Sequence, residues 1–280
     1  MCLSTASKVI SSADFLWIGA GVGIGVDSGL PDFRGDRGFW KAYPPLQQAG
    51  LTFYDMANPQ SFQDDASRAW GVYGHRLQLY RDTQPHVGFQ ILRSWCQAPG
   101  KRSFVFTSNV DGHFQAASFC EREIFECHGT IHRLQCSRPC SELTWENTEN
   151  ELEIETKTLR AVSPLPRCPK CHSIARPNIL MFQDGDWVSR HAREQLDRYE
   201  QWLNQLAGHS LAVLEIGAGT AVPTVRMEAE RLARLPGATL IRINPRDHDS
   251  PGDALSIRQP AVEALQHLDR CIRPTGSNKS

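Results

Sequence analysis

The sequence predicts an α/β protein built on one parallel sheet with helices on both faces. Strand-like apolar runs recur at residues 15–20, 103–107, 211–216 and 238–243. Helix-like segments alternate with them at about residues 64–80, 86–95, 189–206, 224–234 and 259–270. Strands that are apolar throughout and are separated by helices are typical of a parallel sheet covered on both sides. Between residues 135 and 175, charged residues, threonine and proline dominate instead, which predicts a small inserted module.

The bulk composition argues against several classes of protein. Of the 280 residues, 40% are hydrophobic and 22% are charged, as in a typical globular chain. The formal net charge of -1 does not suit a protein that binds nucleic acid by neutralising its phosphates. No apolar run approaches the ~20 residues of a membrane span, and the first residues lack the pattern of a secretory signal. We therefore expect a cytoplasmic protein with no nucleic-acid or membrane partner.

A glycine-rich turn follows the first strand-like run. Gly21, Gly23 and Gly25 are spaced closely enough to let the backbone turn sharply and approach a pyrophosphate. Taken alone, such glycines are equally typical of an ordinary tight turn. Because Pro31 disfavours helix in the residue before it, we expect the turn to lead into a loop instead of a helix. That loop would carry an acid, an aromatic ring and a guanidinium over a bound nucleotide: Asp32, Phe33 and Arg34.

The first helix-like segment carries a tyrosine and an arginine three residues apart. Tyr73 and Arg76 share one face of a helix at that spacing. A guanidinium can bind a carboxylate bidentately, and a phenol can add a further hydrogen bond. The alternative is an aromatic ring that packs between helices beside an arginine in a surface ion pair.

Polar residues follow the next strand-like run and a short strand at residues 124–125. Asn109 and Asp111 precede a glycine, a pattern that also suits an Asx turn. His128 follows the short strand, and an imidazole with a pKa near ~6.5 can take a proton at neutral pH. A thiol–imidazole dyad with Cys127 is disfavoured, because adjacent residues on a strand point to opposite faces.

Four of the nine cysteines form two close pairs. Cys136 and Cys140 make the first pair, and Cys168 and Cys171 make the second. Four thiolates at such spacings fill a tetrahedral zinc shell and leave no position for water, so we predict one structural zinc per chain. His172 is an alternative ligand, but the cysteines already complete the shell.

Two further loops follow the last two strand-like runs. The first contains Gly217, Ala218 and Gly219, and the second contains Asn244 and Pro245. In parallel sheets, ligands bind at the carboxyl ends of the strands. All four loops that follow strand-like runs would lie at that edge, so we expect them to converge on one crevice.

These motifs resemble those of the sirtuins, which are NAD-dependent protein-lysine deacylases. The family signature of Gly-Ala-Gly-x-Ser and Gly-Ile-Pro-x-Phe-Arg is matched at Gly21, Gly23, Gly29, Pro31, Phe33 and Arg34. Val22 replaces the alanine of that signature and Gly25 replaces its serine. The segment at residues 107–112 is similar to the family's Thr-Gln-Asn-Ile-Asp-Gly, with Ser108 in place of glutamine. His128 stands eight residues before the first zinc cysteine, as in sirtuins, and the resemblance covers roughly residues 13–269.

The resemblance implies a role for each motif. It implies His128 as the general base and Asn109 as a second catalytic residue. It implies NAD binding by Gly21, Val22, Gly23, Gly25, Asp32, Phe33, Arg34, Ser108, Asn109, Val110, Asp111, Gly217, Ala218, Gly219, Asn244 and Pro245. It implies that an extended peptide pairs with Ile179, Leu180, Met181 and Phe182, for which the alternative is an interior strand of the sheet. Tyr73 and Arg76 resemble the Tyr-x-x-Arg pair of sirtuins that prefer succinyl-, malonyl- or glutaryl-lysine.

The implied fold is a Rossmann-like NAD-binding domain at residues 1–131 and 176–280, with a helical insert at about 36–85. A zinc module at residues 132–175 interrupts it, and residues 274–280 are predicted to form a disordered tail. The implied activity is removal of acyl groups from protein lysine, giving nicotinamide, O-acyl-ADP-ribose and free lysine. Two alternatives remain: an ADP-ribosyltransferase or NAD hydrolase on the same fold, and a non-catalytic protein that binds NAD or ADP-ribose.

Overall fold

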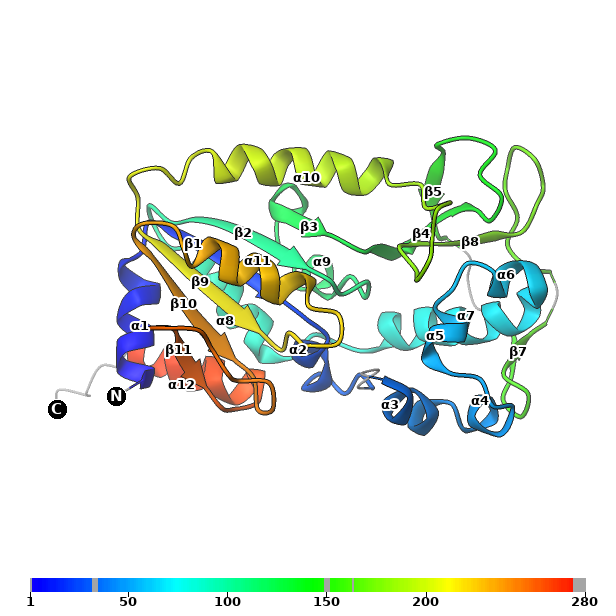
Figure 1. The fold of residues 1–280 in the computed structure, drawn as a ribbon, viewed down its shortest axis with the longest axis horizontal. Helices are drawn as coiled ribbons and strands as arrows, with labels where there is room; N and C mark the ends of the chain where they lie inside the picture. Colours follow the sequence, from blue (N-terminus) through cyan, green and yellow to red (C-terminus); the bar gives the residue numbers. More distant parts are fainter. Residues whose placement is uncertain (1, 32–34, 149–151, 163, 274–280) are drawn as a thin grey trace, which may run out of the picture.

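The computed structural model describes residues 2–31, 35–148, 152–162 and 164–273, and it divides into two lobes (Figure 1). The sheet lobe holds a six-stranded sheet, and the small lobe holds short helices and a three-stranded sheet. The tail predicted at residues 274–280 lies outside the described residues. Among the helices of the described residues, none is both long and apolar enough to cross a bilayer.

All neighbouring strands in the sheet lobe are parallel, which confirms the predicted α/β fold. Their spatial order is β11 (Leu255–Ile257), β10 (Ala238–Ile243), β9 (Leu211–Ile216), β1 (Phe15–Ala20), β2 (Arg102–Thr107) and β3 (Ile124–Glu126). Every residue of β1 and β9 is buried, as expected for strands covered on both faces. The sequence analysis did not identify β11, a strand of three residues at the edge of the sheet.

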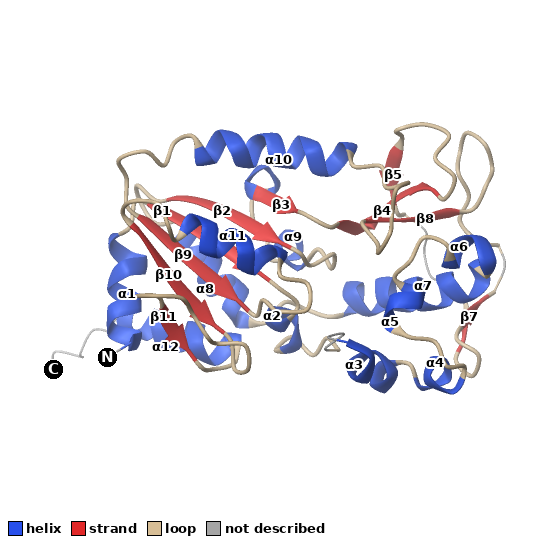
Figure 2. Cartoon of the chain, viewed as in Figure 1, coloured by secondary structure: helices blue, strands red, loops and turns tan. Residues whose placement is uncertain are grey.

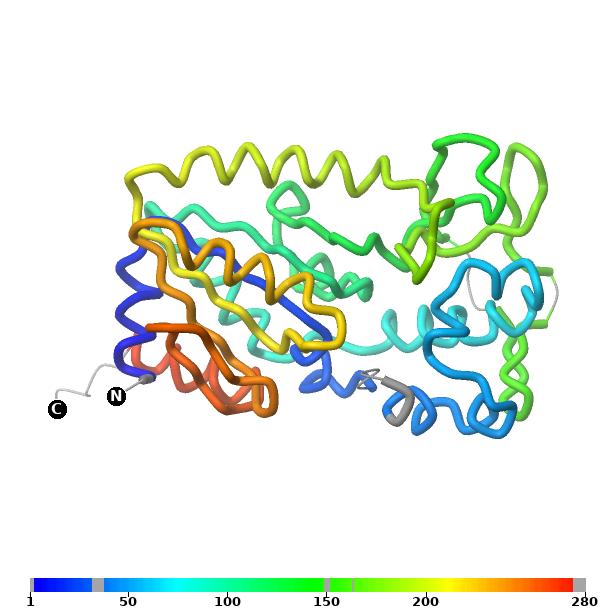
Figure 3. The backbone as a smooth tube through the Cα atoms, in the orientation of Figure 1, coloured from blue at the N-terminus to red at the C-terminus, as the bar shows by residue number. Residues whose placement is uncertain are grey.

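Helices cover both faces of this sheet (Figure 2). One face packs against α1 (Cys2–Ser12), α8 (Val87–Cys96) and α12 (Ala261–Ile272), and the other against α10 (Arg190–Leu203) and α11 (Thr224–Leu232). Along β1, Leu16 and Ile18 join the first core, whereas Phe15 and Trp17 join the second, because successive side chains on a strand point to opposite faces. The helix α1, which the sequence analysis did not predict, packs beside α12 at one end of the molecule (Figure 3).

A charged pair interrupts two strands that the sequence pattern predicts as apolar. Glu215 on β9 and Arg242 on β10 are partners in the strand register, and both side chains are fully buried. Arg242 donates to both carboxylate oxygens of Glu215, from Nε and Nη2, at 2.8 Å each. This bidentate pairing satisfies two charges that would otherwise be costly to bury.

The small lobe combines a row of helices with an antiparallel sheet. The helices are α3 (Gly35–Ala42), α4 (Pro44–Gln48), α5 (Phe53–Met56), α6 (Ser61–Asp64) and α7 (Ala66–Asp82). The sheet has the order β5 (Thr144–Glu146), β4 (Gly129–Cys136) and β8 (Ala175–Ile179), and a hairpin of β6 (Ile154–Glu155) and β7 (Arg160–Ala161) lies against α7. β8 lies at the edge of this small sheet, and residues 180–182 follow it outside any strand, so the alternative of an interior strand for residues 177–182 is wrong.

One hydrophobic core joins the helical insert to the zinc segment. It includes Trp70 and Tyr73 of α7, Ile131 and Leu134 of β4, and Ala175 of β8. The buried Trp70 Nε1 donates a hydrogen bond of 2.8 Å to the Ala175 carbonyl oxygen. The predicted domain ranges place these two segments in different domains, but the segments fold around a common core. The ranges themselves stay a prediction.

The glycine turn after β1 differs from the sequence expectation in one respect. The predicted loop begins with a short helix, α2 (Gly23–Val26). Pro31 restricts only the residue directly before it, so it does not prevent a helical turn that ends several residues earlier. The chain leaves that turn at Gly29, whose positive φ of 94° suits glycine. Asp32, Phe33 and Arg34 lie outside the described residues.

Candidate active site

A cavity of about 720 Å³ lies where the two lobes meet. Residues from all four loops that follow β1, β2, β9 and β10 line it, as does α7 of the small lobe. Of the predicted site residues, those that line the cavity are Gly21, Val22, Tyr73, Arg76, Ser108, Asn109, Val110, Asp111, His128, Ile179, Leu180, Met181, Phe182, Ala218 and Gly219. Those that lie outside its lining are Gly23, Gly25, Gly217, Asn244 and Pro245.

The glycine turns after β1 and β9 pack directly against each other. The amide of Gly21 donates to the Ile216 carbonyl oxygen at 3.0 Å. A Cβ atom on Gly21 would lie 2.6 Å from the Cα atom of Ala218. At Gly217, where φ is +62°, a Cβ atom would lie 2.5 Å from the amide nitrogen of Ile24. Any larger side chain would force the two loops apart, so these glycines bring both loops to one rim of the cavity.

Asn244 links the loop after β10 to the loop after β9. Its side chain is fully buried, and its Nδ2 donates to the Ala218 carbonyl oxygen at 2.8 Å. Its Oδ1 accepts from the amides of Arg246 and Asp247, both at 3.0 Å. The side-chain amide thus orders the loop whose Asp247 lines the cavity. The predicted contact of Asn244 with a ribose stays a prediction.

Asn109 and Asp111 lie on the loop after β2. Asn109 Nδ2 donates to the Gly21 carbonyl oxygen at 3.2 Å, which ties this loop to the glycine turn. Asp111 is 8% exposed, and its Oδ1 accepts from the amide of His113 at 2.9 Å. The side chain therefore forms the Asx turn of the alternative interpretation and still lines the cavity.

His128 lies between β3 and β4, where the chain passes from the sheet lobe to the small lobe (Figure 1). Its half-buried ring lines the cavity, with Nε2 3.2 Å from Thr224 Oγ1. Burial lowers the pKa of His128 from the usual 6.5, while a hydrogen bond to the Ser108 backbone raises it. The imidazole is therefore neutral at physiological pH and can accept a proton. Burial raises the pKa of the Cys127 thiol, which argues against a thiolate nucleophile beside it.

Tyr73 and Arg76 project from α7 into the small-lobe end of the cavity, as their spacing predicts. The Cζ atom of Arg76 lies 5.4 Å from the Tyr73 ring centroid. Burial disfavours the charge of Arg76, but the neighbouring phenols of Tyr80 and Tyr73 raise its pKa overall. Sequence reasoning missed Tyr80, which also lines the cavity. The same spacing rule could have found it, because Tyr80 is one turn beyond Arg76 on the helix.

The chain beyond β8 forms another wall of the cavity. The amide of Leu180 donates to the His128 carbonyl oxygen at 2.9 Å, and the Leu180 side chain is 38% exposed. The Phe182 ring stacks on Tyr54 of α5 with a centroid distance of 4.8 Å. Tyr54 is a lining residue that the sequence analysis did not identify, and it lies in a short helix without a recognisable motif.

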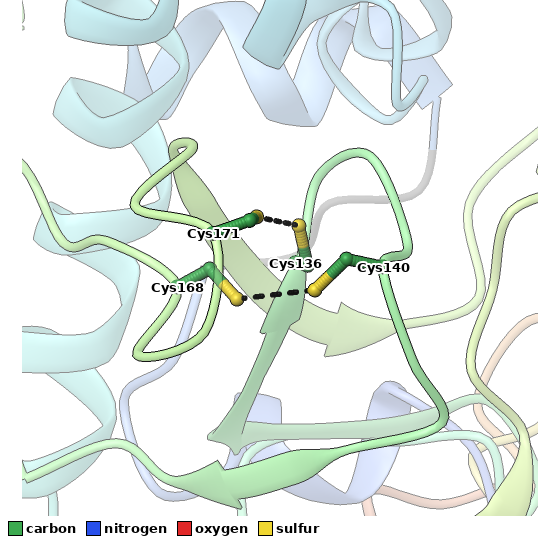
Figure 4. A group of neighbouring side chains, drawn as sticks. All are labelled: Cys136, Cys140, Cys168 and Cys171. Carbon is green, nitrogen blue, oxygen red and sulfur yellow. Dashed lines mark hydrogen bonds between the residues drawn. The ribbon is translucent and has the colours of Figure 1, made fainter.

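The four paired cysteines meet in the small lobe (Figure 4). Their sulfur atoms all lie within 4.8 Å of one another, with 3.5 Å between Cys136 and Cys171 and 3.6 Å between Cys140 and Cys168. Zinc–sulfur bonds of about 2.3 Å in a tetrahedron place the sulfurs about 3.8 Å apart. The donor set therefore fits one structural zinc, which would join the end of β4 to the loop before β8. Among the described residues, His172 is not part of this group.

Comparison with known families identifies the chain. Residues 19–214 match the profile of the Sir2 family, which is more than half of the 280 residues. The chain belongs to the Sir2 family. A curated relative from Mycolicibacterium paratuberculosis, named NAD-dependent protein deacylase, is 30% identical over 89% of this chain and 94% of its own length. A relative of the same name from Aeropyrum pernix is 28% identical over 95% of this chain and 96% of its own length.

Solved Sir2 structures share the fold. An ADP-ribose complex of a Sir2 homologue superimposes with a TM-score of 0.69, at 23% identity, over 99% of this chain and 98% of that chain. A Sir2 homologue bound to NAD gives a TM-score of 0.67, at 23% identity, over 96% and 93% of the two chains. These superpositions show the shared fold, and the family match over residues 19–214 confirms the resemblance to sirtuins that the sequence motifs predict.

Proposed function

We propose that this Sir2-family chain is an NAD-dependent protein-lysine deacylase that yields nicotinamide, O-acyl-ADP-ribose and free lysine. The observation that carries the proposal is the position of His128. Its imidazole lines one cavity together with the glycine turn at Gly21, the loop at Asn109 and the edge segment at Leu180. A base, a nucleotide-binding rim and a peptide-binding edge are the parts that deacylation requires. The relatives named NAD-dependent protein deacylase support this assignment.

The cavity suits NAD at the rim formed by the sheet lobe. Gly21 lines this rim, and the absence of a side chain there lets its turn pack against the loop at Ala218, so that backbone from both loops would border a bound nucleotide. When bound, NAD supplies an anomeric carbon that accepts the acyl oxygen and a nicotinamide that leaves. Asn109 and Asp111 lie on one loop of the cavity wall and would hold the nicotinamide ribose and carboxamide. His128 would take a proton from a ribose hydroxyl, because its lowered pKa keeps the imidazole neutral.

An acylated protein lysine is the proposed partner. Because β8 is an edge strand, an extended peptide can add to it through backbone hydrogen bonds and needs little side-chain specificity. Leu180 and Phe182 border the cavity and would contact the peptide on either side of the lysine. The described cysteines are free, which supports a reducing compartment, and we propose the cytoplasm.

For the acyl group, we propose a preference for succinyl or malonyl over acetyl. Arg76 lies at the wall opposite the nucleotide rim, and a substrate carboxylate would pair with its guanidinium. We expect Arg76→Met to lower the succinyl-to-acetyl ratio of kcat/KM by about ten- to a hundredfold, the value of a charge-assisted hydrogen bond. A parent enzyme that strongly prefers acetyl, or an unchanged ratio in the variant, would contradict this preference.

Nicotinamide release measured with and without an acylated peptide tests the activity. We expect release to depend on the acyl-lysine peptide and mass spectrometry to find O-acyl-ADP-ribose. Release without any peptide would instead indicate an NAD hydrolase, and ADP-ribose attached to protein would indicate a transferase. Binding of NAD with no release under either condition would indicate a non-catalytic regulator.

A further inference from the structure

A second phenol contacts the arginine at the acyl end of the cavity. Tyr80 follows Arg76 by one turn of α7, and both side chains line the cavity. Tyr80 is 7% exposed. Its hydroxyl oxygen accepts hydrogen bonds from Arg76 Nε at 3.1 Å and from Nη2 at 2.8 Å.

These two hydrogen bonds use one particular edge of the guanidinium. Nε and one Nη form the side-on pair of donors with which an arginine can bind a carboxylate bidentately. In this chain both donors meet the same phenolic oxygen, whose two lone pairs can accept them. The Tyr73 ring lies against the same guanidinium. Two aromatic residues of one helix therefore hold Arg76 in a defined orientation.

We propose that Tyr80 is a positioning residue that sets the preference for acidic acyl groups by orienting Arg76. The proposal rests on the function proposed above, because it concerns the acyl end of the deacylase cavity. A guanidinium that is already oriented loses less conformational freedom when a carboxylate binds, which strengthens binding. Because Tyr80 occupies the side-on edge, the carboxylate approaches the guanidinium from another side. The acyl carboxylate lies away from the reacting carbonyl, so the effect belongs to substrate binding more than to the chemical step.

The test compares peptide affinities in the parent and in Tyr80→Phe. This substitution removes the hydroxyl and keeps the ring beside Arg76. One fluorescent peptide, in succinyl-lysine and acetyl-lysine forms, is titrated by fluorescence anisotropy. We expect the succinyl-to-acetyl affinity ratio to fall about tenfold, within the range of a hydrogen bond to a charged group. The affinity for the acetyl peptide shows that the variant is folded.

Tyr199→Phe is the matched control. Tyr199 is also a buried tyrosine whose hydroxyl is hydrogen-bonded, to Trp17 Nε1 at 3.0 Å and to Glu228, but it lies in the core of the sheet lobe and does not line the cavity. We expect this variant to keep the parent ratio. An unchanged ratio in Tyr80→Phe, or an equal fall in Tyr199→Phe, would overturn the proposal. So would a parent protein that binds the succinyl peptide no more tightly than the acetyl peptide.

Nicotinamide release from NAD in the presence of each peptide is measured in parallel. It reports on the proposed function independently of the affinities. A parent that binds succinyl peptide in a Tyr80-dependent way but releases no nicotinamide would support the role of Tyr80 and refute the deacylase. Turnover of both peptides with a ratio insensitive to Tyr80→Phe would support the deacylase and refute the role of Tyr80.

Discussion

The sheet lobe and the small lobe differ in how clearly the local sequence marks their elements. In the sheet lobe, β1, β9 and β10 are short runs of chain whose own apolar pattern places them in the interior. In the small lobe, one core gathers side chains from helices, from two sheets and from segments far apart in sequence. The bond between Trp70 and Ala175, for example, joins residues 105 positions apart. The short apolar strands of the first lobe are therefore plain in the sequence, although they pair over long separations, as β1 does with β9. The core of the second lobe has no such local mark apart from the cysteine cluster.

The proposed chemistry divides between the lobes in the same way. The nucleotide rim belongs to the loops of the sheet lobe, and the acyl end belongs to α7 of the small lobe. His128 lies on the connection between β3 and β4, which joins the two. Because different elements carry the nucleotide rim and the acyl end, we expect that acyl preference can change while nucleotide binding is kept.

The largest expected effect is that of losing the zinc site. This change should show the clearest difference in stability between the small lobe and the sheet lobe. We expect Cys168→Ala to lose zinc and to unfold the three-stranded sheet, because structural zinc contributes about 10–16 kcal/mol in zinc-finger peptides. Elemental analysis and hydrogen exchange in β4 and β8, compared with β1 and β9, provide the measurement. Parent-like protection of β4 in a zinc-free protein would show that the small lobe does not depend on the metal.

The next effect concerns the junction of the lobes. We expect His128→Ala to reduce deacylation by about 10²- to 10⁴-fold, the usual contribution of a general base. NAD affinity should largely remain, because the nucleotide rim is built from glycine turns of the sheet lobe. Single-turnover assays and calorimetric titration with NAD measure the two quantities. Deacylation at the parental rate would exclude His128 as the base.

A smaller effect is expected where the β6–β7 hairpin packs against α7. A Cβ atom on Gly71 would lie 1.9 Å from the Leu159 carbonyl oxygen, so Gly71→Ala should destabilise the protein by about 1–3 kcal/mol through overpacking. Gly74→Ala is the matched control, because the nearest atoms to its Cβ would be the side-chain tips of Ile154 and Leu152, at 3.2 Å each, and no backbone atom is among its three nearest neighbours. Its gain in helix propensity, up to ~1 kcal/mol, should make it neutral or stabilising. Urea unfolding measures both, and equal effects would refute the close packing.

The smallest effect is the pH dependence that His128 gives to deacylation. Burial lowers the pKa of His128 below 6.5, so the neutral base persists to lower pH than it would in water. As the pH falls through that lowered pKa, the imidazole becomes protonated and deacylation is lost. The acid limb of kcat/KM should therefore have its midpoint below pH 6.5, the usual imidazole value. A midpoint above that value would contradict the effect of burial.

The sheet lobe was more predictable than the small lobe for a physical reason. Strands that are buried on both faces are mostly apolar, so residues 15–20, 211–216 and 238–243 were recognisable in isolation. The cysteine pairs were equally recognisable, because metal ligation restricts residue type and spacing. The pairing of Glu215 with Arg242 was not predictable, since it depends on the register between two strands.

The residues of the candidate site also divide into those that the sequence predicted and those that it did not. The spacing of Tyr73 and Arg76 predicted that they project together, because both lie on one helix. Thr224 contacts His128 and Tyr54 lines the cavity, but both come from other elements and carry no motif, so nothing in the sequence marked them. The functional roles predicted for Asn244, and for Asp32, Phe33 and Arg34 outside the described residues, stay predictions.

The sequence by itself determined the family, the parallel sheet and the four cysteines that fit a zinc site, because glycine turns, apolar strands and cysteine pairs act over a few neighbouring residues. The tertiary structure alone decided that the helical insert and the zinc segment share one core. It also decided that β8 is an edge strand and that Thr224 meets His128. Each of these depends on how distant segments pack, and packing is set by the sum of many weak contacts that no local pattern records.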